Sequence, residues 1–580
     1  MSVSTGDIVS RVYGNFRGVD FRGEEVNLRR SPDALNVWKD YRETESIRTR
    51  AGLQQFHGTS KTIRSIAFYN GNMIAHIDDS LCEMNWEGTI NTTLLKVGTK
   101  PGNSFVYNGK FYFMNADHYI EYDGKEVKDV VGYVPTTTIG RRPSGGGTKH
   151  EDVNMLSEWR INSFLADGYD QVQGDGITTN RYGSTKYYLD TTNCDREEIE
   201  DIFVEVDGED ISYLEEKWTF DKVKGIVTFV EAPLAPKTDG QDNVKIKFKK
   251  RVAGYRENIL NCTLLQVFDN RVFVSGNPDY PNYVWHCSLD DPTYWSDLDY
   301  YREGMDSAQI KGLVAGNNAL WVFRESSDAN TNVFYHTPTL DAEYGKIYPS
   351  SHSSITIGCV GKAINFNDDI VFFSERGMEG ISGDITTEQV AAHRSSLVDR
   401  KLLSESGYAN MILEEWEGYL LCIIGKKVYL ADSRSRFTYE DHIEYDWFYW
   451  ELEQEITCAK VYKGVLYLGT KDGIYTLTND EAAIKSYWVT PKDKFSAASK
   501  LKTTNKRGCV AEAKGDISVY VKVEDTDFEL IGKYENIEDY FVSRIKRKKF
   551  KDIQLKFHSD TRFSLETVTL ECFIGGYIKR

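Results

Sequence analysis

The sequence predicts an all-β protein whose main part is a β-propeller of about six to seven blades. The first observation behind this prediction is a phrase that recurs seven times along the chain. It consists of an apolar or aromatic strand, a two-residue turn and a second apolar strand, as in Phe68–Ile74 and Val461–Leu468. Asn, Asp and Gly fill most of these turns, and they tolerate the positive φ angles of type I′ hairpins.

The second observation is the spacing of the turns, which begin at residues 70, 108, 269, 317, 367, 417 and 463. All intervals but one lie between 38 and 50 residues, which is the length of a four-stranded propeller blade. The longer interval reaches the same length once an insertion of roughly 115 residues is removed. A β-sandwich, or a chain of unrelated hairpins, would also contain such turns but would not require a constant period.

The composition agrees with an all-β fold. Aromatic residues make up 13% of the chain, with 36 Tyr and 28 Phe, and these residues favour strands. Short helices are expected only at Met155–Leu165 and Ser395–Met411.

Breaks in the strand pattern predict five segments. The stretch Arg141–Lys149 is rich in Gly and Ser and reads as a linker before a separate unit. The predicted segments are an N-terminal arm and propeller-closing segment (1–62), the first blades (63–140), an inserted β-sandwich domain (141–255), the remaining blades (256–483) and a C-terminal β-sandwich domain (484–580).

Charge and cysteine usage narrow the function classes. The net charge of -18 argues against nucleic-acid binding through a basic surface. Nine cysteines are scattered without a CxxC pair, so free buried thiols of a reducing compartment are expected rather than disulfides or a zinc site. The N-terminus lacks a signal-peptide pattern, and the longest aliphatic run, Leu420–Ile424, is too short to span a bilayer. We therefore expect a soluble protein without a membrane segment.

Familiar catalytic motifs are absent from the sequence. It contains no GxSxG elbow, no HExxH, no phosphate-binding loop and no GxGxxG after a strand. The segment Asp167–Gly176 places carboxylates near glycines, but it lacks the ordered ligand positions of a calcium loop and is expected to be a polar turn. No catalytic residue, cofactor or metal is predicted.

Three charged or aromatic runs are candidate contact surfaces. Residues 195–216 hold 11 acidic residues against one basic residue, and this run either repels DNA, meets a basic partner or is a solvated face. The densest basic run is a candidate partner contact, or else a charged edge strand that blocks stray pairing. It comprises Arg544, Lys546, Arg547, Lys548 and Lys549. A third run is a candidate aromatic interface or glycan platform, or else blade core. It comprises Tyr280, Tyr283, Trp285, Tyr294 and Trp295.

Several segments then resemble a known family. They are Asn27–Asn36, Ile47–Gly52, Asn270–Gly276 leading into Asp291–Ser296, Ile310–Phe323 and Gly358–Gly377. These segments resemble the nozzle (tail tubular) proteins of short-tailed bacteriophages and the related phage stabilisation proteins. That family usually has Arg-Pro-Gly where this chain has Arg50-Ala51-Gly52.

The resemblance implies a non-catalytic virion protein, assembled in the cytoplasm of the host bacterium. It implies a self-assembled ring, expected to be a hexamer, that continues the DNA channel below the portal and adaptor. Such a ring retains the packaged genome, passes double-stranded DNA during ejection, and contacts the adaptor ring and tail fibre or distal tail proteins. An acidic lumen would let DNA slide through, because it repels phosphates.

Two other functions remain open. One is a carbohydrate-binding or glycan-cleaving propeller used in receptor recognition, which would need paired carboxylates such as Asp290, Asp369 or Glu375 facing a funnel. The other is a scaffold propeller of a cell.

Overall fold

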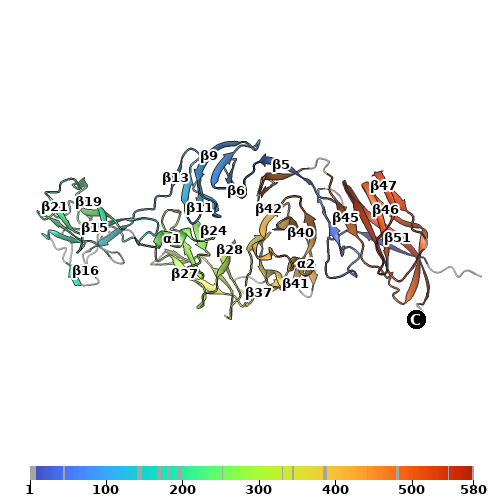
Figure 1. The fold of residues 1–580 in the computed structure, drawn as a ribbon. Helices are drawn as coiled ribbons and strands as arrows, with labels where there is room; N and C mark the ends of the chain where they lie inside the picture. Colours follow the sequence, from blue (N-terminus) through green and yellow to red (C-terminus); the bar gives the residue numbers. More distant parts are fainter. Residues whose placement is uncertain are drawn as a thin grey trace, which may run out of the picture. The chain divides into compact units, whose positions relative to one another are not determined.

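The computed structural model confirms the predicted fold class, because the chain is an all-β protein built mainly from four-stranded antiparallel sheets (Figure 1). It divides into two compact units. Unit 1 comprises Met1–Pro101, Lys311–Thr339 and Ile347–Arg580, and unit 2 comprises Gly102–Ile310 and Leu340–Lys346. The structure describes residues 8–42, 46–139, 147–166, 171–173, 176–178, 183–191, 199–250, 252–328, 331–342, 345–382, 388–439, 442–478, 483–546 and 548–577.

Seven blade-type sheets can be traced in the described residues, five of them in unit 1. The first sheet of unit 1 consists of β6 (Ile63–Tyr69), β7 (Asn72–Ile77), β8 (Ser80–Met84) and β9 (Ile90–Lys96). The second consists of β28 (Ile310–Gly316), β29 (Ala319–Arg324), β30 (Val333–His336) and β33 (Ser350–His352). The third consists of β34 (Ala363–Phe366), β35 (Asp369–Ser374), β36 (Gly377–Ser382) and β37 (Val390–His393). The fourth consists of β38 (Ile412–Trp416), β39 (Tyr419–Ile424), β40 (Lys427–Tyr439) and β41 (His442–Glu451).

The fifth sheet of unit 1 combines strands from two distant parts of the chain. It consists of β42 (Ile456–Tyr462), β43 (Val465–Thr470), β44 (Gly473–Thr478) and, as its fourth strand, β5 (Gly52–Gly58). The antiparallel register of β5 on β44 runs from Gly58 opposite Gly473 to Gly52 opposite Thr478. An N-terminal strand therefore completes a sheet that is otherwise formed by residues 456–478.

Unit 2 contains the other two blade-type sheets. One consists of β10 (Asn103–Tyr107), β11 (Lys110–Met114), β12 (Tyr119–Tyr122) and β13 (Val127–Asp129), and the other of β24 (Leu264–Phe268), β25 (Arg271–Ser275), β26 (Tyr283–His286) and β27 (Tyr300–Arg302). A short hairpin of β31 (Thr339–Asp341) and β32 (Gly345–Ile347) lies outside the blade-type sheets.

All seven predicted turns join the first two strands of a blade-type sheet, and both central residues of each turn have positive φ. This is the type I′ geometry that the sequence predicted. The turn pairs are Asn70-Gly71, Asn108-Gly109, Asp269-Asn270, Asn317-Asn318, Asn367-Asp368, Glu417-Gly418 and Lys463-Gly464.

The turn at Gly71 yields a test of backbone strain that is free of steric clashes. Its φ is +86°, and a Cβ added there would meet no atom within 4 Å. We expect Gly71→Ala to destabilise the chain by about 1 kcal/mol, because an L-residue pays that cost in the left-handed region. Gly23→Ala is the matched control, since it also meets no atom within 4 Å but has no positive φ. Equal urea midpoints for the two variants would contradict the turn assignment.

The inserted domain packs a five-stranded sheet and a three-stranded sheet around one apolar core. The five-stranded sheet consists of β14 (Thr136–Ile139), β15 (Trp159–Phe164), β23 (Val244–Lys249), β19 (Glu200–Val206) and β20 (Glu209–Asp210). The three-stranded sheet consists of β18 (Lys186–Tyr188), β22 (Ile226–Phe229) and β21 (Trp218–Asp221), and β16 (Gln171–Gln173) and β17 (Gly176–Thr178) form a separate pair. The domain thus begins at β14, before the expected boundary at 141.

The helix predictions were partly wrong. Met155–Leu165 contains a turn and then β15, because alternate side chains of this strand enter the domain core. Ser395–Met411 does hold short helices, α2 (Asp399–Leu402) and the 3-10 helix η2 (Tyr408–Asn410). Helix α1 (Tyr255–Leu260) was not predicted.

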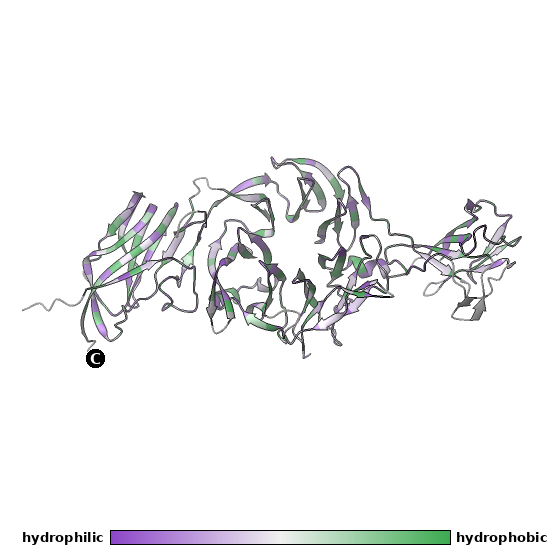
Figure 2. Cartoon of the chain, turned by 180° about the vertical axis from the view of Figure 1, so that it is seen from behind, coloured by the Kyte–Doolittle hydropathy of each residue, from purple (hydrophilic) through white to green (hydrophobic). Residues whose placement is uncertain are grey.

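The C-terminal β-domain shares one hydrogen-bonded network of fifteen strands with β38–β41 and with the N-terminal strands. Its own strands are β45 (Ser486–Val489), β46 (Lys500–Val523), β47 (Glu529–Ile537), β48 (Tyr540–Ser543), β49 (Lys549–Phe550), β50 (Ile553–Ser559) and β51 (Phe563–Tyr577). The N-terminal strands are β1 (Ile8–Gly14), β2 (Ala34–Leu35), β3 (Val37–Trp38) and β4 (Ile47–Thr49). Hydrophobic and hydrophilic residues alternate along the C-terminal strands (Figure 2), as expected for a β-domain with one buried face.

The described cysteines are all unpaired, and seven of the eight are buried. Burial raises the pKa of the Cys287 and Cys359 thiols to about 12, so these thiols stay protonated and unreactive. Cys194 lies outside the described residues.

Candidate functional site

The N-terminal segment (residues 8–58) connects distant parts of unit 1. β1 and β4 pair with β51, β2 pairs with β45, β3 pairs with β41, and β5 pairs with β44. A single stretch of chain therefore joins two blade-type sheets to the C-terminal β-domain through backbone hydrogen bonds. We call the buried polar contacts around Arg17, Arg30, Asn36 and Arg50 the N-terminal junction.

One half of the junction is centred on Asp446 of β41, which is fully buried. Arg17 donates from Nε to one carboxylate oxygen at 2.8 Å, and Arg30 donates from Nη2 to the other at 2.6 Å. The Arg30 guanidinium also lies 4.2 Å from the ring centroid of Phe437. This carboxylate keeps the incoming chain on β41 through the buried Arg30 and the partly exposed Arg17, since neither Asp446 nor Arg30 could remain buried as a lone charge.

The other half is centred on Asn36, which has a positive φ of 55°. Its Oδ1 accepts hydrogen bonds from Arg50 Nε at 3.0 Å and from the backbone N–H of Glu451 at 2.8 Å. Its Nδ2 donates to the carbonyl of Lys485 at 2.9 Å, just before β45. Arg50 is fully buried and donates further to Glu453 Oε1 at 2.6 Å. One amide side chain thus bridges β41 and the strand that opens the C-terminal domain.

Close backbone approach completes the junction at Gly18. A Cβ at this residue would lie 1.9 Å from the carbonyl oxygen of Trp447, so only glycine fits there. The neighbouring N–H of Val19 donates to that same carbonyl at 2.7 Å.

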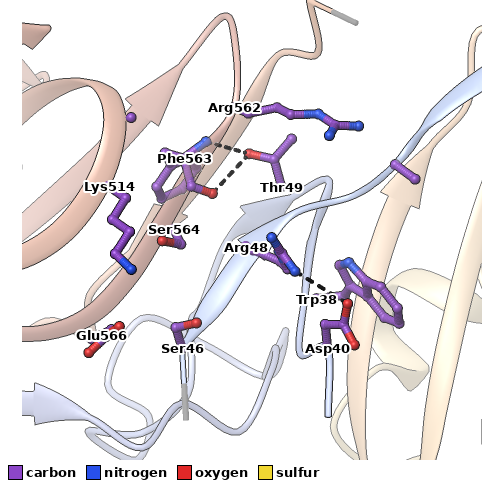
Figure 3. A pocket seen from close by; sticks show the side chains of 12 residues that line it. Trp38, Asp40, Ser46, Arg48, Thr49, Lys514, Arg562, Phe563, Ser564 and Glu566 are labelled. Atoms are coloured by element: carbon purple, nitrogen blue, oxygen red, sulfur yellow. Dashed lines mark hydrogen bonds and ion pairs between the residues drawn. The ribbon is translucent and has the colours of Figure 1, made fainter. Parts of the chain in front are cut away.

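A pocket of about 250 Å³ opens beside the junction, between the N-terminal segment and β51 (Figure 3). Arg48 Nη1 lies 3.3 Å from Asp40 Oδ2, and the Thr49 hydroxyl accepts a hydrogen bond from the Phe563 backbone N–H at 3.1 Å. Burial, together with the neighbouring Glu512 carboxylate, raises the pKa of Glu566. The described lining residues form ion pairs and hydrogen bonds to the backbone. None of them is a serine, cysteine or threonine activated by a histidine.

His393 is held between two carboxylates in the third sheet of unit 1. Its Nε2 lies 2.6 Å from Asp399 Oδ2 and its Nδ1 lies 3.1 Å from Glu379 Oε1. The nearby Ser395 hydroxyl donates to Asp399 at 2.6 Å rather than to the histidine, so this group does not form a nucleophile–base pair. Burial opposes protonation, but the bonds to Asp399 and Glu379 prevail and raise the pKa of His393 to about 10.

This shift predicts a pH-dependent stability. A histidine whose folded pKa is raised contributes stability that is complete below pH 6.5 and is lost as the pH rises towards 10. We therefore expect the difference in melting temperature between wild type and His393→Gln to be large at pH 6 and small at pH 10. A difference that stays constant across this range would contradict the protonated bridge.

The residues of the basic run differ in exposure and in their contacts within the chain. Arg544, Lys546 and Lys549 are exposed, as a partner contact requires. Lys548 is half-buried, and its Nζ forms an ion pair with Glu529. Arg547 lies outside the described residues.

The five residues of the predicted aromatic platform do not form one exposed surface, because some are buried and others are half-buried or exposed. Trp295 is fully buried, and its Nε1 donates to the Pro292 carbonyl at 2.8 Å, so it belongs to the core of unit 2. Trp285 is also buried, and the half-buried Tyr294 packs on Tyr133 with ring centroids 5.1 Å apart. The interface prediction is therefore wrong for both tryptophans, because they fill space beneath the sheet.

A smaller exposed ledge remains at the edge of the β24–β27 sheet. Tyr280 and Tyr300 are 39% and 42% exposed. Tyr283 lies between them, stacked on Tyr300 at 5.1 Å and in contact with Tyr280 at 5.3 Å.

Two of the three candidate glycosidase carboxylates have other partners. Asp369 is 2.9 Å from the buried Arg394 and accepts a hydrogen bond from Tyr445 at 2.6 Å. Asp290 accepts a hydrogen bond from Tyr107 at 3.3 Å, and Glu375 is exposed. Asp369 is thus a structural ion-pair partner.

The acidic run forms an exposed face of the inserted domain. The exposed members are Glu200, Asp201, Asp207, Glu209, Asp210, Glu215 and Glu216, while Glu205 pairs with Lys245 at 3.3 Å. Asp195, Glu197 and Glu198 lie outside the described residues, as does most of Asp167–Gly176.

The described ranges hold neither a metal-ligand cluster nor a helix suited to a bilayer. No three metal-ligating side chains come together in that part of the chain. No helix within it is long and apolar enough to cross a bilayer.

Comparison with known proteins adds only distant likenesses. No family model and no curated protein matches the sequence. Similar solved structures include BamB from Moraxella catarrhalis, at 9% identity, with 75% of this chain and 99% of that chain covered and a TM-score of 0.34. The extracellular domain of a putative one-component system from B. thetaiotaomicron matches at 11% identity, covering 89% of this chain and 78% of that chain, with a TM-score of 0.24.

An exo-β-1,3-galactanase from Phanerochaete chrysosporium matches at 9% identity, covering 53% of this chain and 95% of that chain, with a TM-score of 0.22. Likenesses at such low identity and TM-score carry no argument about function. The fold and junction define this chain as an all-β propeller protein with a buried joint to a C-terminal β-domain.

Proposed function

We propose that this chain is a structural virion protein of a tailed phage, which assembles into a nozzle ring and continues the DNA channel below the portal and adaptor. The N-terminal junction is the observation that carries the proposal. Arg30 and Asn36 lie in the first segment that resembles the nozzle family, and Arg50 lies in the second. The same residues make the buried contacts to Asp446, Glu451 and Glu453.

The physical role of such a joint is to transmit force. A sheet that continues from a blade into another domain resists separation, because its backbone hydrogen bonds must break together. A channel component that holds packaged DNA needs this resistance, whereas an enzyme needs an accessible reactive group. The net charge of -18 also suits a surface along which phosphates pass without binding.

The proposal is tested by the assembly state and location of the protein. We expect the purified chain, or the chain co-expressed with its neighbours, to form rings of about six copies in negative-stain images, since closed cyclic symmetry is usual for such assemblies. We also expect labelled antibody to mark the phage tail. A chain that remains monomeric at every concentration, and that no antibody detects in virions, would overturn the proposal.

The tyrosine ledge favours a second candidate function in receptor recognition. Exposed aromatic faces stack on sugars, and Tyr280 and Tyr300 are accessible for such contact. Binding on a glycan array that is lost in Tyr300→Ala, with an unchanged melting temperature, would support this function. Absence of binding on the array would leave the ring protein as the better account.

A further inference from the structure

A groove in the inserted domain has an apolar centre and an acidic rim. It encloses about 590 Å³ between the β19–β20 hairpin and the segment that follows β22. Val230 and Leu234 line this groove, and they are 67% and 74% exposed.

The rim carries more negative than positive charge. Its acidic residues are Asp207, Glu209, Glu216 and Glu231, and its basic residues are Lys217 and Lys237. Within the described part of the chain, no ion pair reaches Glu209, Glu216 or Glu231. Neighbouring exposed apolar side chains with a polar rim are typical of protein–protein contact sites.

A stripe on the C-terminal β-domain has the matching chemistry. Alternate side chains along β48 and the residues after it are exposed, and they change from apolar to basic. Tyr540 and Val542 are 62% and 46% exposed, Arg544 and Lys546 are exposed, and the intervening Ile545 is buried. Successive outward residues in an extended chain lie about 6.6 Å apart, so the two cations point the same way. No ion pair within the described residues holds Arg544 or Lys546.

We propose that the stripe of one copy docks in the groove of a second copy of this chain. Tyr540 and Val542 would cover Val230 and Leu234, and Arg544 and Lys546 would pair with Glu216 and Glu231. The occupant is another copy of this chain, because the stripe complements the groove in both respects. Its apolar residues match the apolar centre of the groove, and its positive charges match the acidic rim. This inference rests on the proposed function, since it names the contact that builds the ring.

The contact joins two different surfaces, so each copy offers one groove and one stripe. Such a heterologous contact either closes into a ring or extends as a fibre. It is also electrostatic in part, so we expect assembly to weaken as salt shortens the range of the charges.

Charge reversal in the full chain tests the pairing from both sides. The stripe variant is Arg544→Glu with Lys546→Glu, and the groove variant is Glu216→Lys with Glu231→Lys. Each alone is expected to weaken self-association about tenfold or more, as measured by analytical ultracentrifugation, because like charges then face each other. Lys533→Glu and Glu200→Lys serve as controls, since both residues are exposed on the same two domains but lie outside the stripe and groove.

Mixing the two variants gives the sharper result. The reversed stripe fits the reversed groove, and the wild-type stripe of the groove variant fits the wild-type groove of the stripe variant. An equimolar mixture should therefore recover assembly as an alternating ring with an even number of copies. Val542→Cys together with Leu234→Cys should give an intermolecular disulfide under oxidising conditions.

The outcomes separate this inference from the proposed function. If both charge variants form rings as readily as the wild type does, and mixing them changes nothing, the docking contact is overturned. The proposed function as a ring protein would still stand. A disulfide that forms only within one copy would also overturn it. Wild-type chains that never assemble would overturn the docking contact together with the proposed function.

Discussion

Replacing Asp446 by alanine is expected to destabilise unit 1 by about 3–5 kcal/mol, which is the usual cost of removing one partner from a buried ion pair. The carboxylate is fully buried and binds Arg17 and Arg30 through its two oxygens. Its removal leaves Arg30 without its ion-pair partner in a site where only 8% of that side chain is exposed. The N-terminal segment should then detach from β41 before the blade-type sheets unfold.

Limited proteolysis combined with urea unfolding can check this expectation. The Asp446→Ala variant should be cut within residues 8–58 at protease levels that leave the wild type intact, and its unfolding midpoint should fall. Glu25→Gln is a suitable control, because it removes an exposed ion pair with Lys494 on the same segment and should change stability by less than about 1 kcal/mol. Equal protection of Asp446→Ala and wild type would show that the junction does not hold the segment in place.

The hairpins could be predicted from sequence because their information is local. The signal of a hairpin is a pair of adjacent residues that tolerate positive φ, flanked by apolar residues, and all of it lies within a short run of consecutive positions. Even the turns Glu417-Gly418 and Lys463-Gly464, whose first residues rarely adopt positive φ, fit once the period is recognised. Local chemistry and a regular repeat together define a blade-type sheet.

The junction could not be derived in this way, because most of its partners are hundreds of residues apart in sequence. Arg30 and Asp446 become neighbours only when the N-terminal segment is laid across β41. One signal was available: Asp446 interrupts a run of aromatic residues in β41, and a carboxylate in a buried strand requires a cation. The residues near Asp446 in the sequence do not indicate which cation pairs with it.

The aromatic run at 280–301 shows the opposite difficulty. Its residue types suit an interface and a core equally well, and only the three-dimensional environment decides between them. Trp295 packs into the core of unit 2, and its backbone N–H donates to Asn154 Oδ1 at 2.9 Å. Composition alone cannot distinguish this from the exposed position of Tyr300.

Replacing Trp321 by alanine is the other change with a large expected effect, a loss of about 3–5 kcal/mol. Trp321 lies on β29 with 1% of its surface exposed, and its Nε1 donates to the Gly316 carbonyl at 3.1 Å. It belongs to a core cluster that also contains Ile370 and Phe372 of the neighbouring sheet. The substitution therefore leaves a cavity between two sheets and an unsatisfied carbonyl.

Trp321→Phe separates these two contributions, because it keeps most of the ring volume but loses the hydrogen-bond donor. We expect its unfolding midpoint in urea to lie between those of wild type and Trp321→Ala. If packing between sheets holds the blades of unit 1 together, the alanine variant should also lose protection from hydrogen exchange in β35, which it does not touch by hydrogen bonding. Normal melting of Trp321→Ala would mean that the sheets stand independently, and the continuity of the propeller would then depend on the N-terminal strands alone.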